Sequence, residues 1–280
     1  MDRPDAFLRR NTAKRLPEPK QICRIASHGS DTARRGRRQT IQARIASKER
    51  IYAIGDVHGR LDLFTDLVAR IREDSEKRCA ALRTRIILMG DIVDRGPDSA
   101  PLVERIRAFA SKQSSLVVLR GNHEDIMADA LRDGDEALFS KWVKYGGAAT
   151  LRSWGISNAV ISGPLPALIA TARKTIPTTV VRWMRKLPLF YRSGDFFFVH
   201  AGIRPGVALW RQSRRDMLWI GKDFTRSTQR HPAVIVHGHS IVEHGPEIHE
   251  NRIALDTGAY RTGKLSAMGF EEDRQWVLST

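Results

Sequence analysis

The stretch Ile86-Ile-Leu-Met-Gly-Asp-Ile-Val-Asp-Arg-Gly96 places an apolar run directly before two aspartates and an arginine framed by glycines. The run Ile86 to Met89 predicts a short buried strand that ends at Gly90. The same arrangement occurs twice more, at Ile51 to Gly59 and at Leu116 to Glu124. Each predicted strand therefore leads into carboxylate, imidazole or amide side chains, and these three strand ends decide the fold.

Helical spacing separates the three predicted strands. Apolar residues recur every three or four positions after the first strand and again after the second, and a further helix is expected from about Glu124. Strands that alternate with helices predict parallel pairing through right-handed crossovers, with ligands at the carboxyl ends of the strands. From Leu189 onward short strands dominate, ending in a hairpin within 265–278, and they predict a second, mixed sheet. The fold class is therefore α/β.

Basic residues gather in the first part of the chain. Residues 1–50 hold 14 Lys/Arg against five Asp/Glu, whereas the whole chain of 280 residues has a net charge of +16. Residues 1–48 show no sustained periodicity, so we expect a disordered basic extension whose charge attracts anionic partners such as nucleic acid or an anionic surface. We expect one catalytic domain over 49–280, with a helical, cap-like insertion at about 147–187.

Cysteine content and hydropathy indicate the compartment. Two cysteines, Cys23 and Cys79, argue against a disulfide framework and favour a reducing cytoplasm. The first residues contain no apolar stretch of the length that a secretory signal needs. The most apolar later stretch, Ala159 to Ala172, is broken by prolines and is too short to cross a bilayer. We therefore expect a cytoplasmic protein without a membrane span.

Five polar clusters follow predicted strands. They share glycines, which let the backbone turn tightly, and side chains that are natural ligands of divalent metals of intermediate hardness. The clusters are Gly55-Asp-Val-His-Gly59, Gly90-Asp-Ile-Val-Asp-Arg-Gly96, Gly121-Asn-His-Glu124, His200-Ala-Gly202 and His237-Gly-His-Ser240. Because such groups would be costly to desolvate separately, we interpret them as one site.

Spacing assigns the ligands to two metal ions. Asp56 and His58 lie at positions i and i+2, so both side chains point to the same face and can reach one ion. Asp91, at the end of the neighbouring strand, can bridge two ions about 3.5 to 4 Å apart with its two oxygens. Three further side chains then complete the shell of the second ion: Asn122, His200 and His237. The sequence predicts two divalent cations, with manganese favoured and iron or zinc as alternatives.

These motifs resemble those of the metallophosphoesterases, and within them the bacterial phosphoprotein phosphatases of the serine/threonine type. The resemblance spans residues 51 to about 270 and includes the segments Trp142–Trp154, Phe198–Ile203, Asp216–Trp219 and Leu255–Ala259. It implies a four-layer α/β/β/α sandwich, in which two mixed sheets are flanked by helices and the metals lie at one edge. It also implies the same division of ligands between two metals, with Asp91 shared.

The resemblance implies how such a site works. A hydroxide shared by the two metals attacks phosphorus, so no protein nucleophile is needed. His123 would protonate the leaving group as the general acid, with Asp94 orienting its ring. Arg95, together with Asn122, would contact the phosphate oxygens of the substrate.

One position departs from the family pattern. The family usually has an arginine that contacts substrate phosphate after Leu-Trp-Ile, whereas here Leu218-Trp-Ile220 precedes Gly221. Loss of one such donor would cost on the order of 10² to 10³ in rate, so a replacement is expected. Our hypothesis is that Lys222 or Arg226 supplies this contact. Two other positions stay open. His239 either supports a ligand or is an ordinary loop histidine, and Trp219 lies either beside the substrate or in the core.

Three functions are compatible with these residues. The favoured one is hydrolysis of phosphoproteins at phosphoserine or phosphothreonine, extending to phosphotyrosine. The first alternative is symmetrical hydrolysis of dinucleoside tetraphosphates, which the same motifs would serve. The second is a catalytically weak metal-site protein that binds nucleic acid or a membrane through residues 1–48. The two enzymatic functions require the ligands between Asp56 and His237 to converge in space.

Overall fold

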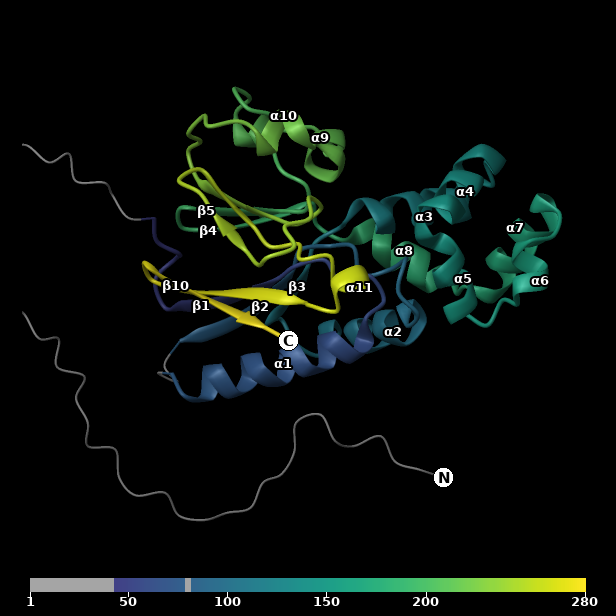
Figure 1. Cartoon of the computed structure of the whole chain (residues 1–280), viewed down its shortest axis with the longest axis horizontal. Helices are drawn as coiled ribbons and strands as arrows, with labels where there is room; N and C mark the ends of the chain where they lie inside the picture. The colour runs from purple at the N-terminus through teal and green to yellow at the C-terminus, as the bar shows by residue number, and fades with distance from the viewer. Residues whose placement is uncertain (1–42, 79–81) are drawn as a thin grey trace, which may run out of the picture. The chain divides into compact units, whose positions relative to one another are not determined.

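The computed structural model describes residues 43–78 and 82–280 (Figure 1). Within these residues two five-stranded sheets pack face to face, with the strand orders β10-β9-β1-β2-β3 and β4-β5-β6-β8-β7. The first sheet contains β1 (Glu49–Ile54), β2 (Arg83–Leu88), β3 (Leu116–Val118), β9 (Ser266–Glu271) and β10 (Arg274–Ser279). The second contains β4 (Phe190–Ser193), β5 (Phe196–Val199), β6 (Val234–His237), β7 (Glu247–Ile248) and β8 (Arg252–Ala254).

Both faces of the first sheet are apolar, because successive side chains of a strand point to opposite sides. On β1, Tyr52 and Ile54 pack in the core shared with α1 (Leu61–Glu76) and α2 (Ser99–Ala110). Ile51 and Ala53 instead pack against the second sheet. The strands β1, β2 and β3 run parallel, as the alternation of strands and helices predicts. The nearly continuous burial of β1 follows from this central position.

Phenylalanines hold the second sheet between two apolar layers. Phe196 and Phe198 of β5 face the first sheet, where the ring of Phe270 lies 5.0 and 5.5 Å from theirs between centroids. Phe197 points the other way, into a cluster that includes residues of α9 (Arg214–Trp219) and α10 (Lys222–Thr225). Helices therefore cover the outer faces of both sheets, and the predicted four-layer sandwich is confirmed (Figure 1).

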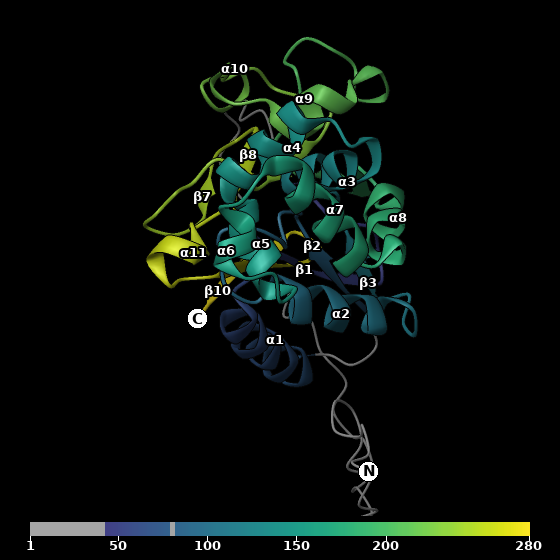
Figure 2. The same ribbon diagram turned by 90° about the vertical axis from the view of Figure 1, so that its right-hand side faces the viewer.

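The segment between β3 and β4 is mainly helical, and its helices face the viewer in Figure 2. It contains α3 (Asn122–Asp133), α4 (Glu136–Trp142), the short turn η1 (Val143–Gly147), α5 (Ala148–Ser153), α6 (Asn158–Ile161), α7 (Leu165–Thr175) and α8 (Thr178–Lys186). Leu168, Val180 and Met184 of α7 and α8 are buried in the same core as α1 and α2. The segment 147–187 is thus helical and shares the main core, and its role as a cap stays a prediction.

The strand assignment differs from expectation in the last part of the chain. The hairpin β9–β10 joins the first sheet rather than the second, because β9 pairs antiparallel with β1. This pairing satisfies the side of β1 that would otherwise be an exposed edge. The edge strands β4 and β7 were not predicted, since most of their side chains are exposed or half-buried and lack apolar patterning.

The described residues begin within the predicted basic extension. Ile45 packs against the second core cluster, and its amide donates to the Glu272 carbonyl at 3.0 Å, so ordered chain precedes Glu49. Residues 1–42 and Cys79 lie outside the described residues, and the predicted disorder and anionic contacts of this extension stay untested. Over 43–78 and 82–280, no helix combines the length and apolar character that a bilayer crossing requires.

Candidate metal centre

The predicted ligands meet at one edge of the sandwich, where strands of both sheets end. Each is at most 3% exposed, which is unusual for side chains of this polarity. They are Asp56 and His58 after β1, Asp91 after β2, Asn122 after β3, His200 after β5 and His237 at the end of β6. The strand ends therefore bring together residues that lie far apart in the sequence.

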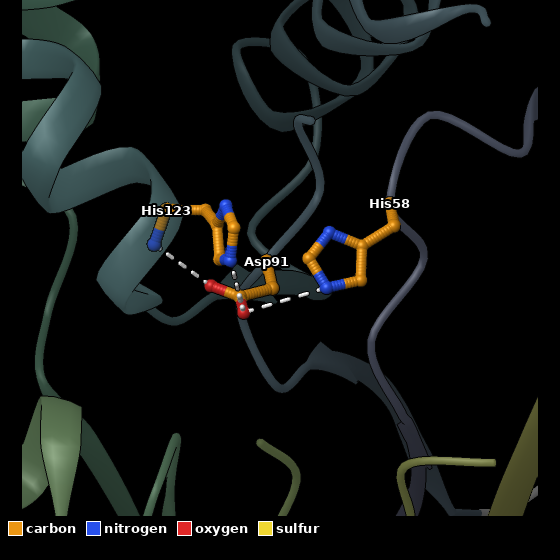
Figure 3. Close-up of side chains that lie close together, drawn as sticks. All are labelled: His58, Asp91 and His123. Atoms are coloured by element: carbon orange, nitrogen blue, oxygen red, sulfur yellow. Dashed lines mark hydrogen bonds and ion pairs between the residues drawn. The ribbon is translucent and has the colours of Figure 1, made fainter. Parts of the chain in front are cut away.

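Asp91 is the hub of this cluster (Figure 3). Its Oδ2 lies 3.6 Å from Nε2 of His58 and 3.9 Å from Nε2 of His123, while its Oδ1 lies 3.4 Å from Nε2 of His200. Burial opposes its ionisation, but the surrounding imidazoles, with His200 foremost, keep the pKa of Asp91 below its usual range. One carboxylate thus faces imidazoles on two sides, as a bridging ligand would.

Two groups of side chains could each hold a metal ion. In the part of the chain that the structure describes, they are His58 with Asp91 and His123, and Asp91 with His200 and His239. Within each group the ligand atoms lie within 4.8 Å of one another. Asp91 belongs to both, which fits its predicted bridging role.

Two histidines present a lone pair to this space. Nδ1 of His58 lies 2.8 Å from the Val93 carbonyl, and Nδ1 of His200 lies 2.9 Å from the Met89 carbonyl. A carbonyl only accepts, so each Nδ1 carries the proton and each Nε2 is left as an acceptor. Burial lowers the pKa of both rings, which keeps them neutral and ready to bind a cation.

Unsatisfied acceptors show that this donor set fits divalent cations. Oδ1 of Asp56 is buried without a hydrogen-bond partner among the described residues. Burial and the nearby carboxylates of Asp256 and Asp91 raise the pKa of Asp56 well above its usual value. Nε2 of His200 faces Oδ1 of Asn122 at 2.8 Å, so two acceptors point at each other. Cations would satisfy these groups, since buried charge in proteins is paired or coordinates metal.

Backbone strain concentrates at the cluster. Seven non-glycine residues of the described chain have positive φ, and five of them belong to the polar clusters. These five are His58, Asp91, Asp94, Arg95 and His239, with φ between 47° and 73°. Such conformations cost of order 1–3 kcal/mol each and persist only where the surrounding structure enforces them. The fold therefore positions these side chains at a cost in stability, as functional sites do.

Two glycines allow the backbone to approach the carboxylates. A β carbon at Gly121 would collide with Oδ1 of Asp91, and one at Gly238 would collide with Oδ1 of Asp56. The glycines that frame the sequence motifs are thus required by space next to the carboxylates.

The geometry favours His239 over the predicted ligand His237. Nδ1 of His239 lies 2.9 Å from Oδ1 of Asn122, and its ring centroid lies 5.1 Å from that of His200. Burial is the main cause that lowers the pKa of His239 to about 3, so the ring is neutral. Its backbone amide also donates to Oδ2 of Asp56 at 3.0 Å, which ties it to the other side of the centre.

His237 lies in a different environment. Its ring meets Phe224 edge-on at 5.1 Å in the cluster on the outer face of the second sheet, and its Nδ1 lies 3.0 Å from the Gly238 carbonyl. Burial lowers its pKa to about 4 against the opposing hydrogen bond to the Gly238 carbonyl, and the main groups that shift it include no carboxylate. Its Nε2 has no partner in the described chain and is left as an acceptor, but neither group of potential metal ligands includes His237. The assignment of His237 as a ligand therefore stays a prediction.

His123 and Asp94 form a buried pair beside Asp91. Nδ1 of His123 lies 2.7 Å from Oδ2 of Asp94, whose oxygens also accept from Nε1 of Trp142 and from the Thr150 hydroxyl. Burial opposes protonation of His123, but the carboxylates of Asp91 and Asp94 outweigh it and raise its pKa above the usual 6.5. The ring is thus held in one orientation with its pKa raised, which suits a proton donor.

Arg95 spans the two imidazoles of the first group. Its Nη1 lies 3.0 Å from Nε2 of His58 and its Nη2 lies 3.1 Å from Nε2 of His123. The guanidinium also lies over the ring of Tyr260, with Cζ 4.8 Å from the centroid. The guanidinium thus places positive charge next to Nε2 of His58, the nitrogen that would otherwise be free to bind metal. A cation bound to His58 would release Arg95 to contact an anionic substrate.

Sequence reasoning missed the part played by Glu124. Its buried carboxylate accepts the backbone amides of Asp91, Ile92, Val93 and Gly121 at 2.8–3.2 Å. Burial, with a further contribution from Asp91, raises its pKa to about 7. A glutamate at the third position of α3 is a typical helix-capping residue, and this was the available signal. Glu124 joins the loop that carries Asp91 to the helix that carries His123.

The two cations proposed to replace the family arginine lie at the two ends of α10, Lys222 as its first residue and Arg226 directly after its last. Lys222 and Arg226 are exposed, and within the described residues no hydrogen bond or ion pair joins either side chain to the cluster. A β carbon at Gly221 would have no atom within 4 Å, so there is open space at this position. The hypothesis that Lys222 or Arg226 contacts the substrate is therefore unsupported by a contact and stays a prediction.

An α/β sandwich that gathers aspartate, histidine and asparagine at its strand ends is the arrangement that the motif resemblance implied for a metallophosphoesterase. The sequence profile of the calcineurin-like phosphoesterase family matches residues 49–265, and the chain belongs to this family. The resemblance found in the motifs is thereby confirmed, and the described residues include groups that could hold the metal ions it implies.

Individual relatives differ in their substrates. The symmetrical bis(5′-nucleosyl)-tetraphosphatase of Aromatoleum aromaticum is 29% identical over 156 residues, which cover 56% of this chain and 45% of that protein. Serine/threonine-protein phosphatase 1 of Salmonella typhimurium is 32% identical over 113 residues, or 40% of this chain and 46% of that one. A protein serine/threonine phosphatase from Saccharomyces cerevisiae has a similar fold, with a TM-score of 0.52, 15% identity and coverage of 83% and 79%. The chain spans about half the length of the curated relatives it matches.

Proposed function

We propose that the chain is a phosphatase that uses two divalent cations to hydrolyse phosphomonoesters of alcohols, with phosphoserine and phosphothreonine in proteins as substrates and activity extending to phosphotyrosine. The observation that carries this proposal is the His123–Asp94 pair beside Asp91. An alkoxide is a poor leaving group unless an acid protonates its oxygen. A buried imidazole whose pKa is raised by two carboxylates is suited to donate that proton near neutral pH.

The side chains fall into two metal-binding sets. Asp56, His58 and Asp91 would hold one cation, and the second set is Asp91, Asn122, His200 and His239, with His239 in place of the predicted His237. Oxygen and imidazole donors without cysteine suit Mn²⁺, with iron or zinc as alternatives. Two cations bound there would lower the pKa of water and supply hydroxide near neutral pH. Because the imidazoles are already neutral, few protons need to leave on binding.

Arg95 would orient the substrate phosphate. Its donors lie on a planar fork that matches two phosphate oxygens and can stabilise the charge that builds there. Stacking on Tyr260 restricts the guanidinium to the neighbourhood of His58 and His123. Arg95 and the acid His123 would therefore act on opposite parts of the same ester.

A metal-by-substrate activity matrix tests the proposal. Metal-free protein is supplied with Mn²⁺, Zn²⁺ or Fe²⁺ and assayed on a phosphoserine peptide, a phosphotyrosine peptide, diadenosine tetraphosphate and glycerol 2-phosphate, with Asp91→Asn as the inactive control. We expect the highest kcat/KM on the phosphoserine peptide. Hydrolysis of the dinucleotide alone would contradict the substrate assignment, and no hydrolysis with any metal would contradict the enzyme.

Symmetrical hydrolysis of dinucleoside tetraphosphates is the second candidate, and the symmetrical tetraphosphatases among the curated relatives favour it by their names. In that reaction the leaving group is a nucleotide phosphate, which departs far more easily than an alkoxide. The acid His123 should then matter less. The dependence of rate on His123 therefore separates the two candidates on one and the same protein.

The remaining expectations concern partners and compartment. Contact of residues 1–48 with nucleic acid or an anionic surface, and a cytoplasmic location, are retained here as proposals. If the basic segment is the functional part, nucleic-acid binding should weaken steeply with salt and disappear when residues 1–42 are deleted.

A further inference from the structure

One lysine lies between two exposed aromatic rings at the rim of the metal centre. Nζ of Lys141, in α4, lies 5.6 Å from the ring centroid of Tyr145 and 5.9 Å from that of Trp219 at the end of α9. Tyr145 is 46% exposed and Trp219 is 36% exposed, although large aromatic side chains of this size are usually more deeply buried. We call Lys141, Tyr145 and Trp219 the aromatic rim.

The aromatic rim adjoins the metal centre on two sides. The ring of Trp219 lies 6.5 Å from that of His239 between centroids. Tyr145 precedes Gly146, whose carbonyl accepts the backbone amide of Arg95 at 3.2 Å. A ligand on this rim would therefore have one end close to Arg95 and His239, where the scissile phosphate is expected.

The space next to Trp219 is open. A β carbon at Gly221, two residues further along, would have no atom within 4 Å. Lys141 forms no hydrogen bond or ion pair with any described residue, so its ammonium is available to an anion. The rim thus combines a free cation with two exposed aromatic faces, and the chain leaves open space at Gly221 nearby.

We propose that the aromatic rim is a nucleotide subsite, in which a base stacks on Trp219 or Tyr145 and Lys141 contacts the phosphate chain next to the scissile phosphorus. Aromatic faces bind every base, because each base has a flat π-surface, and an ammonium is a strong point charge for phosphate. A phosphoserine peptide offers no flat base to stack. The subsite rests on the proposed phosphoesterase activity, and it assigns to Lys141, Tyr145 and Trp219 the preference for a nucleotide over a substrate without a base.

Hydrolysis of a dinucleoside tetraphosphate held in this subsite consumes one water. The water oxygen bonds to one of the two middle phosphorus atoms, and the bond from that phosphorus to the central bridging oxygen breaks. The bridging oxygen departs with the electron pair on the second half, so two nucleoside diphosphates form, and the water protons go to the solvent or to a product phosphate. No oxidant, reductant or further co-reactant is required.

The test compares specificity in the wild type and in Lys141→Ala, Tyr145→Ala and Trp219→Ala. The readout is the ratio of kcat/KM for diadenosine tetraphosphate to kcat/KM for glycerol 2-phosphate, a small monoester without a ring. We expect this ratio to fall on the order of 10-fold in each variant, mainly through KM, because one stacking or ionic contact is lost. Lys174→Ala, an exposed lysine at the end of α7, is the charge-matched control.

Two further measurements keep the test decisive. ADP binding, measured by calorimetry on the same proteins, should weaken on the order of 10-fold in the three rim variants. Trp219→Phe retains a ring and should keep most of the ADP affinity, which separates stacking from general damage. An unchanged specificity ratio and unchanged ADP affinity in all three variants would overturn the subsite.

The outcomes separate this inference from the proposed function. If the wild type hydrolyses nothing with any metal but ADP binding still weakens in the rim variants, the subsite stands and the phosphatase fails. If the wild type hydrolyses monoesters and the rim variants lose activity on a phosphoserine peptide rather than on the dinucleotide, the rim recognises peptide and the nucleotide subsite is wrong.

Discussion

The two sheets deliver their side chains to the metal centre in different ways. In the first sheet, Asp56 and Asp91 follow glycines at the ends of β1 and β2. The sequence predicted these positions, because in each case an apolar run is followed by a glycine and an aspartate. In the second sheet, His237 is the last residue of β6, but His239, beyond the glycine, lies next to Asp91. The difference shows that a strand end is predictable from sequence, whereas the direction of the chain after that end is not.

The reason lies in the turn at Gly238. Residues 237 and 239 would point to the same face if the strand continued. The strand instead ends at His237, Gly238 packs against Asp56, and His239 adopts a φ of 62°. The two histidines therefore face different clusters. The following experiments test which residues at each sheet edge are required for metal binding and catalysis.

The largest effect is expected for Asp91→Asn on the first sheet edge. An amide lacks the negative charge and one of the two acceptor oxygens that bridging requires. We expect kcat/KM to fall by at least about 10³-fold, which corresponds to the loss of several kcal/mol of transition-state stabilisation. Metal content, measured by mass spectrometry of the purified protein, should fall with it. Activity above a tenth of the wild type would show that Asp91 is not the shared ligand.

His123→Gln tests the proposed general acid, which lies beside Asp91. General acid catalysis contributes about 10² to 10⁴ in rate, so we expect a loss near 10³ on a phosphoserine peptide and a much smaller loss on diadenosine tetraphosphate. The pKa of His123 is raised, so the acid form persists above pH 6.5 and activity on the peptide should decline as pH rises through the raised value. A pH–rate profile of both proteins checks this. Equal losses on both substrates would contradict an acid role.

His239→Ala and His237→Phe compare the two candidates on the second sheet edge. Loss of one metal ligand should lower kcat/KM by about 10²-fold or more, since even residues that only support ligands cost 10- to 100-fold. His237→Phe keeps an aromatic ring against Phe224 and should retain activity within a few fold. The reverse result, an active His239→Ala and an inactive, metal-depleted His237→Phe, would restore the sequence-based assignment.

Glu124→Gln should have the smallest effect of the four variants that are expected to lose function. Half of the side-chain amide is a donor and cannot accept the backbone amides of the Asp91 loop and of Gly121. We expect a loss of about 10-fold in metal affinity, measured by competition with a chelator. Glu136→Gln, an exposed glutamate at the start of α4, makes the same chemical change without these contacts. Similar affinities in both variants would mean that the loop holds its position without Glu124.

The fold and the chemistry of the site followed from the sequence because both depend on local signals. Apolar runs ending in glycine located the strands, and carboxylates with imidazoles at their ends indicated metal. Contacts between distant segments left no such signal. Neither the pairing of β9 with β1 nor the lysine flanked by two aromatic rings is visible from spacing, since both join residues that are remote in sequence.

The position of β1 has a consequence for synthesis. β1 is among the first described segments to leave the ribosome, yet one of its two hydrogen-bonding neighbours, β9, is made more than 200 residues later. Non-local strand pairing of this kind is slow to form and leaves an edge open in the meantime. The nascent chain must therefore carry Asp56 on a half-paired strand through most of translation. A chaperone that shields this strand would act before Ser266 emerges, and a truncated product would never complete the sheet.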